Sequence, residues 1–449
     1  MSRTTKWLII CVSVAVLSAA LIGLTLRRHG QRPAVREQSQ LKLLKDVIGI
    51  VRKSYVEEVD TKKLLTGAVE GMLATLDPHS AFMTPEPYRE MQISMSGSFG
   101  GLGIEINIRD EKLTVISPIE DTPAFRAGIK ANDYIWKIGD KLTKGMTITQ
   151  AVNLMRGPKG TRVTLTILRE GQKTPLVFHL VRDTINTKSL KARTLEPGYG
   201  YIRIIQFQER TGQDFQKTLQ LLRQENNGTL KGLILDLRNN PGGLVDTATQ
   251  VVDPFIGEGT SDGTIVSMRG RTPDAQRNYY AHFGPKEPHY PIVVLINGAS
   301  ASASEIIAGA LQDQKRAIIM GTQSYGKGSV QSVITLRDGY GLKLTTARYY
   351  TPSGRSIQAK GIRPDIIVAQ SDVANKTNGS APSPHTATFG NRSSMPAAVK
   401  PSHRTSPPVA AEGDLANDFQ LSRALETLKG LNIFAGLASK PATVTGGGK

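Results

Sequence analysis

The chain has too few cysteines and aromatic residues for several common kinds of site. Its 449 residues include one cysteine, Cys11, which excludes an intrachain disulfide and a cysteine-based metal site. Aromatic residues make up 6% of the sequence, and no basic stripe interleaved with aromatics is present. The formal net charge of +18 therefore does not predict nucleic-acid binding. The scattered basic residues fit an affinity for an anionic membrane surface or cell-wall polymer.

Two common catalytic patterns are also missing. No histidine lies beside the serine-rich segment at 298–304, and no Gly-x-Ser-x-Gly motif occurs, so a Ser-His-Asp triad fits poorly. Residues 321–327 match the first seven positions of a phosphate-binding loop, but the eighth position is Gly328 where Ser or Thr is needed. We therefore expect neither a nucleotide nor a metal at this segment.

The length predicts several domains, and the amino-terminal part predicts a membrane segment and a helical unit. Trp7 to Leu26 is a run of 20 residues without a charge, so residues 1–36 are expected to hold an uncleaved anchor or a signal segment, with a linker. Apolar residues at helical spacing predict two helices within residues 37–95.

Residues 96–183 form a β-rich module that resembles a PDZ domain. A glycine loop leads into alternating residues 104–108, and a short helix is expected over 147–155. The resemblance implies that Gly100, Gly101, Leu102 and Gly103 form a loop that binds a peptide carboxylate. It also implies a pocket for an apolar last side chain, lined by Leu102, Ile104, Val152 and Met155. The alternative is a glycine turn in an ordinary sheet.

Residues 184–370 alternate strands with helices, which predicts an α/β core with functional loops at strand ends. The apolar run 232–237 ends in a turn, 238–243, whose glycines let backbone approach a ligand. Residues 371–415 are rich in Ser, Pro, Thr and Ala and are expected to be a disordered linker. Residues 416–449 are expected to hold a last amphipathic helix and a tail.

The segment 291–331 is the strongest candidate for a catalytic site. A buried strand at 292–296 is followed by a small-residue turn and a helix expected over 305–312. A nucleophile at such an elbow is exposed, and first-turn N–H groups stabilise negative charge beside it. The elbow offers three serines, Ser300, Ser302 and Ser304.

Lys327 is the candidate base. Gly326 and Gly328 leave room for close packing around it, and an extended segment places Gln331 on the same face. A lysine acts as a base in its neutral form, which a dry pocket favours. Gln331 is able to orient the amine without adding charge. A Ser–Lys site is therefore the variant that remains.

Three motifs together resemble the carboxy-terminal processing, or tail-specific, peptidase family. Residues 236–243 read DLRNNPGG, residues 298–305 read GASASASE and residues 325–331 read YGKGSVQ, in family order after the PDZ-like module. The resemblance implies a multidomain α/β protein with a crotonase-like catalytic core. It implies no cofactor.

The resemblance also assigns roles. The nucleophile is Ser302, the general base is Lys327, 25 residues further on, and the supporting residue is Gln331. The oxyanion hole is expected from the N–H of Ala303 and a glycine N–H. For that glycine we favour Gly243, with Gly242 left open, while Ser304 is a candidate helix cap.

The sequence thus predicts a serine endopeptidase that recognises apolar protein C-termini through its PDZ domain. We expect it to be exported to the cell envelope, tethered to the membrane by its first segment, and to form a homo-oligomer through residues 37–95. Substrate tails are expected to gate the site. For Arg156 a helix-end role is expected, with a domain-bridging contact as the alternative.

Three points stay open at this stage. An adaptor protein is a further class of partner. A catalytically inactive PDZ scaffold is the alternative function. An acyl-CoA enzyme on the same core is a weaker one, because such a site has no need of Ser302, Lys327 and Gln331.

Overall fold

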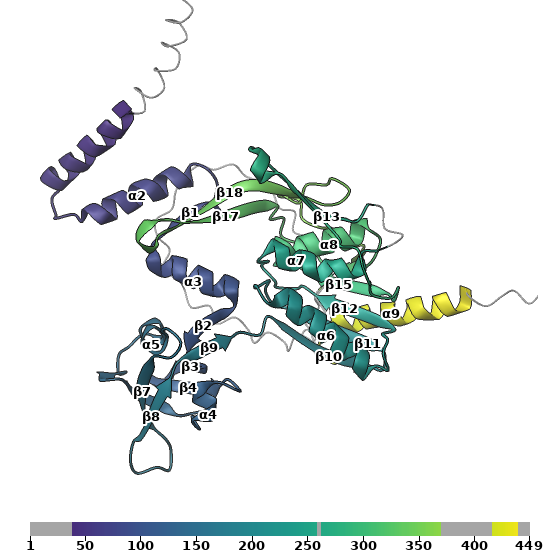
Figure 1. The fold of residues 1–449 in the computed structure, drawn as a ribbon, viewed down its shortest axis with the longest axis horizontal. Helices are drawn as coiled ribbons and strands as arrows, with labels where there is room; N and C mark the ends of the chain where they lie inside the picture. The colour runs from purple at the N-terminus through teal and green to yellow at the C-terminus, as the bar shows by residue number, and fades with distance from the viewer. Residues whose placement is uncertain (1–37, 258–261, 370–414, 439–449) are drawn as a thin grey trace, which may run out of the picture. The chain divides into compact units, whose positions relative to one another are not determined.

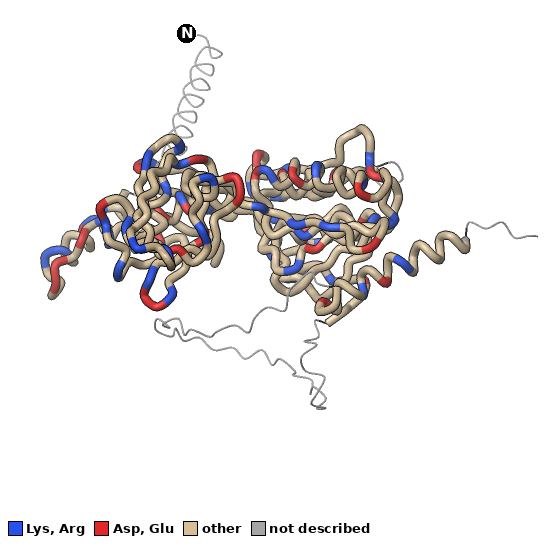
Figure 2. The backbone as a smooth tube through the Cα atoms, turned by 90° about the horizontal axis from the view of Figure 1, so that it is seen from below, with Lys and Arg blue, Asp and Glu red and all other residues tan. Residues whose placement is uncertain are grey.

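A computed structural model describes residues 38–257, 262–369 and 415–438. The predicted membrane segment and most of the predicted linker lie outside these residues. The chain divides into two compact units, the first made of residues up to Met83 with 334–336 and 340–344, the second of the remainder. Figure 2 shows Lys and Arg mixed with Asp and Glu along the described elements of both.

The first unit is helical, as predicted. Residues 38–54 are helical, and α2 (Thr61–Ala74) follows. Asp60 caps α2 by accepting a hydrogen bond of 2.9 Å from the Lys62 N–H. The short strand β1 (Ala81–Met83) pairs antiparallel with the first residues of β18 (Gly341–Tyr350).

The second unit begins with α3 (Pro85–Ser96) and continues into a β-rich domain. Its main antiparallel sheet has the order β3-β4-β5-β7-β8, with β6 beside β5, and β2 pairs with β9. The strands are β2 (Ser98–Gly101), β3 (Ile104–Arg109), β4 (Lys112–Pro118), β5 (Tyr134–Ile138), β6 (Lys141–Leu142), β7 (Arg162–Leu168), β8 (Leu176–Val181) and β9 (Asp183–Asn186). The helices are α4 (Pro123–Arg126) and α5 (Ile148–Met155). β3 is therefore an edge strand.

The second unit also contains a six-stranded sheet with the order β10-β11-β12-β15-β16-β19. Within this sheet, neighbouring strands among β11, β12, β15, β16 and β19 are parallel, while β10 is antiparallel to β11. The strands are β10 (Leu190–Glu196), β11 (Tyr199–Ile204), β12 (Gly232–Asp236), β15 (Ile292–Ile296), β16 (Ile318–Gly321) and β19 (Ile366–Ile367). Strands β12 and β15 are wholly buried, which explains their continuous apolar sequences.

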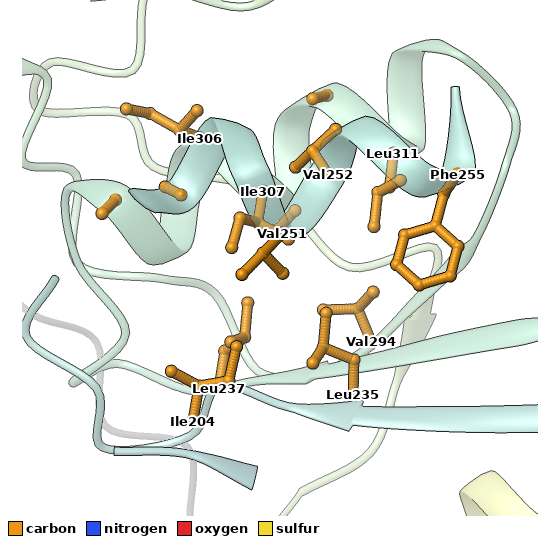
Figure 3. Packing of buried hydrophobic residues seen from close by; sticks show 14 of the residues in the cluster. Ile204, Leu235, Leu237, Val251, Val252, Phe255, Val294, Ile306, Ile307 and Leu311 are labelled. Atoms are coloured by element: carbon orange, nitrogen blue, oxygen red, sulfur yellow. The ribbon is translucent and has the colours of Figure 1, made fainter. Parts of the chain in front are cut away.

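Helices cover both faces of this sheet (Figure 1). The helices α6 (Thr211–Glu225), α7 (Val245–Val252) and α8 (Ala303–Asp313) pack on one face. Figure 3 shows Val251, Ile307 and Leu311 of α7 and α8 facing Leu235 and Val294 of the strands. On the other face α9 (Phe419–Ala438) packs its Leu and Ala side chains against β11, β12, β15 and β16.

A second sheet accompanies this core. It contains β13 (Thr264–Gly270), β14 (Arg277–Tyr280), β17 (Ser329–Thr335) and β18. Three short 3-10 turns, Asp253–Phe255, Pro273–Ala275 and Arg337–Gly339, complete the described elements. The loops after β12, β15 and β16 leave the carboxyl ends of neighbouring parallel strands, where α/β folds bind ligands.

Candidate active site

Ser302 occupies a strained position between β15 and α8. It is the N-cap residue of α8 and has φ 56° and ψ −112°, a conformation that a residue with a Cβ rarely adopts. Such a backbone costs about 1–3 kcal/mol and is typical of functional sites. The Ser302 residue is 8% exposed. The helix begins at Ala303, two residues earlier than predicted, so Ser302 and not Ser304 is the cap.

The other two serines of the elbow are structural. The Ser300 hydroxyl donates to the Leu237 carbonyl at 2.8 Å, and the Ser304 hydroxyl donates to the Asn240 carbonyl at 3.0 Å. Both serines are fully buried. In the described part of the chain the Ser302 hydroxyl has no such carbonyl acceptor. The outer serines thus hold the elbow to the turn after β12.

Glu305 joins the two predicted catalytic segments. Its carboxylate is fully buried and accepts hydrogen bonds from the Ser302 N–H at 2.8 Å and the Lys327 N–H at 2.9 Å, both on Oε2. Its Oε1 accepts from the Gly326 N–H at 2.7 Å and the Ser324 hydroxyl at 2.6 Å. The backbone nitrogens of Ser302 and Lys327 therefore lie within 5.7 Å of each other, the sum of their two distances to Oε2.

Sequence reasoning did not single out Glu305. Its spacing from Ser302 fits the capping pattern S-x-x-E, so the bond to the Ser302 N–H had a readable signal. No sequence pattern indicates the hydrogen bonds from residues 324–327 to Glu305, because they join segments about 20 residues apart through one side chain.

Lys327 and Gln331 lie at the start of β17. Lys327 precedes the strand and is half-buried. The Gln331 amide nitrogen donates to the hydroxyls of Ser329 at 3.1 Å and Thr345 at 3.0 Å. Gly328 is required here, since a Cβ on it would lie 2.3 Å from the Gln358 backbone nitrogen. Gly328 therefore lets this segment approach Gln358 closely, while close packing around the Lys327 amine stays a prediction.

The turn after β12 presents its glycines to the elbow. Gly242, with φ 103°, approaches so closely that a Cβ on it would lie 2.8 Å from the Ser302 Cβ. Its N–H donates to the Asn240 side chain at 2.8 Å. Gly243 is exposed, and in the described part of the chain neither its N–H nor that of Ala303 has an acceptor. Of the two glycines left open by the sequence, Gly243 has the available donor.

The predicted peptide-binding residues fall in one β-rich domain. Gly100 and Gly101 lie in β2, paired with β9, and a Cβ on Gly100 would lie 2.1 Å from the Gly157 carbonyl. Leu102 and Met155 are 3% and 6% exposed and belong to the domain's core. The half-buried residues of the predicted pocket are Ile104 and Val152.

Arg156 follows α5 and contacts α3. Its guanidinium donates to the Glu90 carboxylate at 2.6 and 2.8 Å and lies 4.5 Å from the centre of the Phe99 ring. One turn earlier, Asn153 donates to Glu86 at 2.9 Å. The arginine thus connects α5 to α3 within one compact unit, and both its expected helix-end role and the domain-bridging alternative stay predictions.

The described residues contain no group of side chains arranged to hold a metal ion. Within the same residues, no helix is both long enough and apolar enough to cross a bilayer. The predicted anchor at Trp7 to Leu26 lies outside them.

Comparison with known proteins gives three family matches along the chain. Residues 198–368 match peptidase family S41, residues 24–87 the activating protease CtpB N-terminal domain, and residues 114–169 a PDZ domain.

Relatives of similar length accompany these matches. A carboxy-terminal-processing protease of Bartonella bacilliformis is 50% identical over 332 residues, 74% of this chain and 75% of that protein. The carboxy-terminal processing protease CtpB of Bacillus subtilis is 37% identical over 327 residues, 72% of this chain and 66% of that protein. The solved structure of a photosystem II D1 C-terminal processing protease is 28% identical, covers 73% of this chain and 92% of that one, and gives a TM-score of 0.42.

Proposed function

The chain belongs to peptidase family S41 as a carboxy-terminal processing protease, and on this premise we propose that it cleaves proteins with Ser302 as nucleophile and Lys327 as general base. One observation carries the proposal. The buried Glu305 carboxylate bonds the backbones of both residues, so a single fixed group sets their separation. The strained Ser302 backbone is a second support, because such strain is typical of a nucleophile elbow.

The proposed reaction begins with proton transfer from the Ser302 hydroxyl to the neutral Lys327 amine. The serine oxygen attacks the scissile carbonyl, and the resulting oxyanion receives hydrogen bonds from the N–H groups of Gly243 and Ala303. The lysine ammonium then gives its proton to the leaving amine, which produces an acyl-enzyme that water hydrolyses. The Gln331 amide nitrogen is held by two hydroxyls, so its oxygen is the group that orients the lysine.

The test uses the full chain purified in detergent and an unfolded protein substrate that ends in apolar residues. We expect Ser302→Ala and Lys327→Ala each to lower kcat/KM by about 10³-fold or more. Glu426→Gln on the exposed side of α9 is the control, since it leaves the elbow and its hydrogen bonds unchanged. Undiminished cleavage by Ser302→Ala refutes the assignment. Binding without turnover by the unmodified chain under every condition would instead support an inactive PDZ scaffold.

We also propose that the PDZ domain binds the apolar C-terminal tails of protein substrates. The edge strand β3 pairs with β4 on one side, so its other side is able to accept a peptide as an added strand. Among the described residues, the N–H groups of Leu102 and Gly103 have no acceptor, which suits a loop that binds a carboxylate. Ile104 and Val152 are the wall that a last side chain contacts.

Peptide anisotropy tests this binding mode. A labelled peptide with an apolar last residue and a free carboxylate is expected to bind at least about tenfold more tightly than its C-terminal amide, because the amide lacks the charge that the N–H groups stabilise. Val152→Asp is expected to weaken the binding of both peptides. Equal affinity of the two peptides contradicts the proposal.

Location and assembly complete the proposal. We infer that the chain is exported to the cell envelope and tethered through Trp7 to Leu26, with an adaptor left open as a partner.

Self-association through the helical unit is supported by the exposure of Leu41 (61%), Leu44 (43%) and Ile50 (63%) on its first helix. A monomer at all concentrations by light scattering would count against it, and retention of the chain in the soluble fraction after lysis would count against tethering.

A further inference from the structure

A buried ionic cluster connects the last helix to the turn that carries Gly243. Arg238 is the first residue of that turn, and its side chain is 1% exposed. Its Nε and Nη2 donate to the Asp236 carboxylate at 2.9 and 2.7 Å. Its Nη1 and Nη2 donate to the Asp418 carboxylate at 2.8 and 2.6 Å, across 180 residues of sequence. A buried guanidinium needs such partners, since an unpaired charge is costly in the interior.

Asp418 serves two groups at once. Its Oδ1 also accepts from the Leu421 N–H at 3.0 Å, which makes Asp418 the cap of α9 and places its charge at the helix amino terminus. Gln420 acts beside it, because its Oε1 accepts from Arg238 Nη1 at 3.0 Å and its Nε2 donates to the Val368 carbonyl at 2.7 Å. The first turn of α9 is therefore fixed to Arg238 and to the end of β19.

Tyr201 also belongs to the cluster around Arg238. The Tyr201 hydroxyl donates to Asp236 Oδ2 at 2.8 Å and stabilises it. Desolvation and the Asp236 charge raise the pKa of Tyr201, so this hydroxyl remains a donor across the physiological range. The cluster is thus satisfied at every member, a condition under which buried ionic groups fix one geometry.

Contacts continue from Arg238 to Ser302. Asn239 and Asn297 exchange hydrogen bonds, with the Asn239 N–H donating at 3.0 Å and the Asn297 amide at 2.9 Å. The Asn240 carbonyl accepts from the Ala301 N–H and the Ser304 hydroxyl, both at 3.0 Å. The turn held by Arg238 is therefore bonded directly to the serine elbow.

We propose that Asp418, assisted by Gln420, is a positioning residue that acts through Arg238 to hold the Gly243 N–H beside Ser302. This inference rests on the proposed catalytic roles of Ser302 and Gly243. Asp418 and Gln420 lie outside the segment that matches peptidase family S41, which ends at residue 368. The carboxy-terminal helix is thus a component of the active-site framework as well as a cover for the sheet.

The deciding variant is Asp418→Asn in the full chain. Asparagine is a good helix cap, so the change keeps the bond to α9 and removes the charge that holds Arg238. Loss of one oxyanion donor lowers kcat by about 10²–10³-fold, and we expect a displaced donor to lower it about ten- to a hundredfold with KM nearly unchanged. Asp418→Glu is expected to recover part of kcat. Glu426→Gln on the exposed side of α9 is the matched control.

Two further measurements separate positioning from general damage. Substrate affinity, measured by anisotropy in the Ser302→Ala background with and without Asp418→Asn, should be equal, while the rate of labelling by a fluorophosphonate should fall with kcat. If Asp418→Asn does not fold, Gln420→Ala tests the inference in its place. We expect it to lower kcat and the labelling rate as well, but by a smaller factor.

The outcomes are distinct. A folded Asp418→Asn or Gln420→Ala variant with unchanged kcat overturns the inference while Ser302→Ala stays inactive. A fall in affinity with unchanged kcat also overturns it. An active Ser302→Ala variant overturns the proposed function itself.

Discussion

The backbone of Ser302 stores strain that substitution can release. Glycine adopts its φ of 56° and ψ of −112° without a steric penalty, whereas alanine keeps the Cβ that makes this conformation costly. We expect Ser302→Gly to be inactive, like Ser302→Ala, but more stable than Ser302→Ala by about 1 kcal/mol. Urea unfolding of the two variants measures the difference. Equal stability would mean that the elbow relaxes.

Glu305 is the residue on which both catalytic segments depend. Glutamine has the same shape but one acceptor oxygen, so its NH₂ would face N–H groups that the carboxylate now satisfies. Hydrogen bonds to a charged group contribute about 1.5–3 kcal/mol each, and we expect Glu305→Gln to lose about 3 kcal/mol of unfolding free energy together with most of the activity. The exposed Glu426→Gln change serves as control. Unaltered unfolding and activity would contradict this role.

Asp313, at the end of α8, gives a pH-dependent contribution to stability. Burial acts to raise the pKa of Asp313, but hydrogen bonds from Ser353 and Thr351 and the charge of Arg355 lower it below its usual value. A lowered folded-state pKa contributes stability that is complete above the unfolded value of about 4 and is lost as the pH falls through the folded value. The difference in unfolding free energy between the wild type and Asp313→Asn should therefore become smaller from pH 6 to pH 3. Thermal unfolding at several pH values measures this difference, and a difference that does not change with pH would contradict the role of Asp313.

Among the elements, α9 is the one whose removal should damage the core most. Leu421, Ala424 and Leu428 are fully buried against the sheet. Each buried leucine contributes about 1.5–3 kcal/mol. A chain that stops at residue 414 should expose this face of the sheet, and we expect it to aggregate or to unfold at lower urea. Deleting residues 376–405 instead, and keeping α9, should preserve the unfolding midpoint. A truncated chain as stable as the wild type would refute this role of α9.

Local elements were the part of the fold that sequence patterns predicted well. The apolar run bounded by Pro291 and Asn297-Gly298 predicted β15 over the residues that form it. The short helix expected over 147–155 was predicted to within one residue of α5. These signals are local, since periodicity and flanking Gly, Pro and Asn residues specify them. The start of α8 was wrong by two residues because three serines competed for the cap.

Long-range pairing was beyond the same patterns. The motifs identified Ser302, Lys327 and the glycine turn as one site through resemblance, and their catalytic roles stay predictions. Nothing in the sequence near Arg238 indicates that its partner is Asp418, because a buried ion pair has no periodicity. The hydrogen bonds between Glu305 and residues 324–327 could not be predicted from the sequence either. The residue boundaries of the predicted domains also stay predictions.

At the scale of the whole molecule, the PDZ domain precedes the peptidase core, an order that suits control by substrate tails. Arg156 and Asn153 bond α3, which lies between the helical unit and the PDZ domain in the sequence. If tails gate the site, deletion of residues 97–182 should change both the basal rate and the choice among substrates with different last residues. Competition assays with two tails measure the choice. Unchanged rate and choice would show that gating is wrong.

The position of Asp418 in the sequence also has a consequence in time. Residues 418–438 leave the ribosome long after Ser302 and Lys327, so a nascent chain holds both reacting groups before the helix that steadies their turn has been made. If Asp418 positions the turn as proposed, peptidase activity should reach its full value only after residues 418–438 have been synthesised.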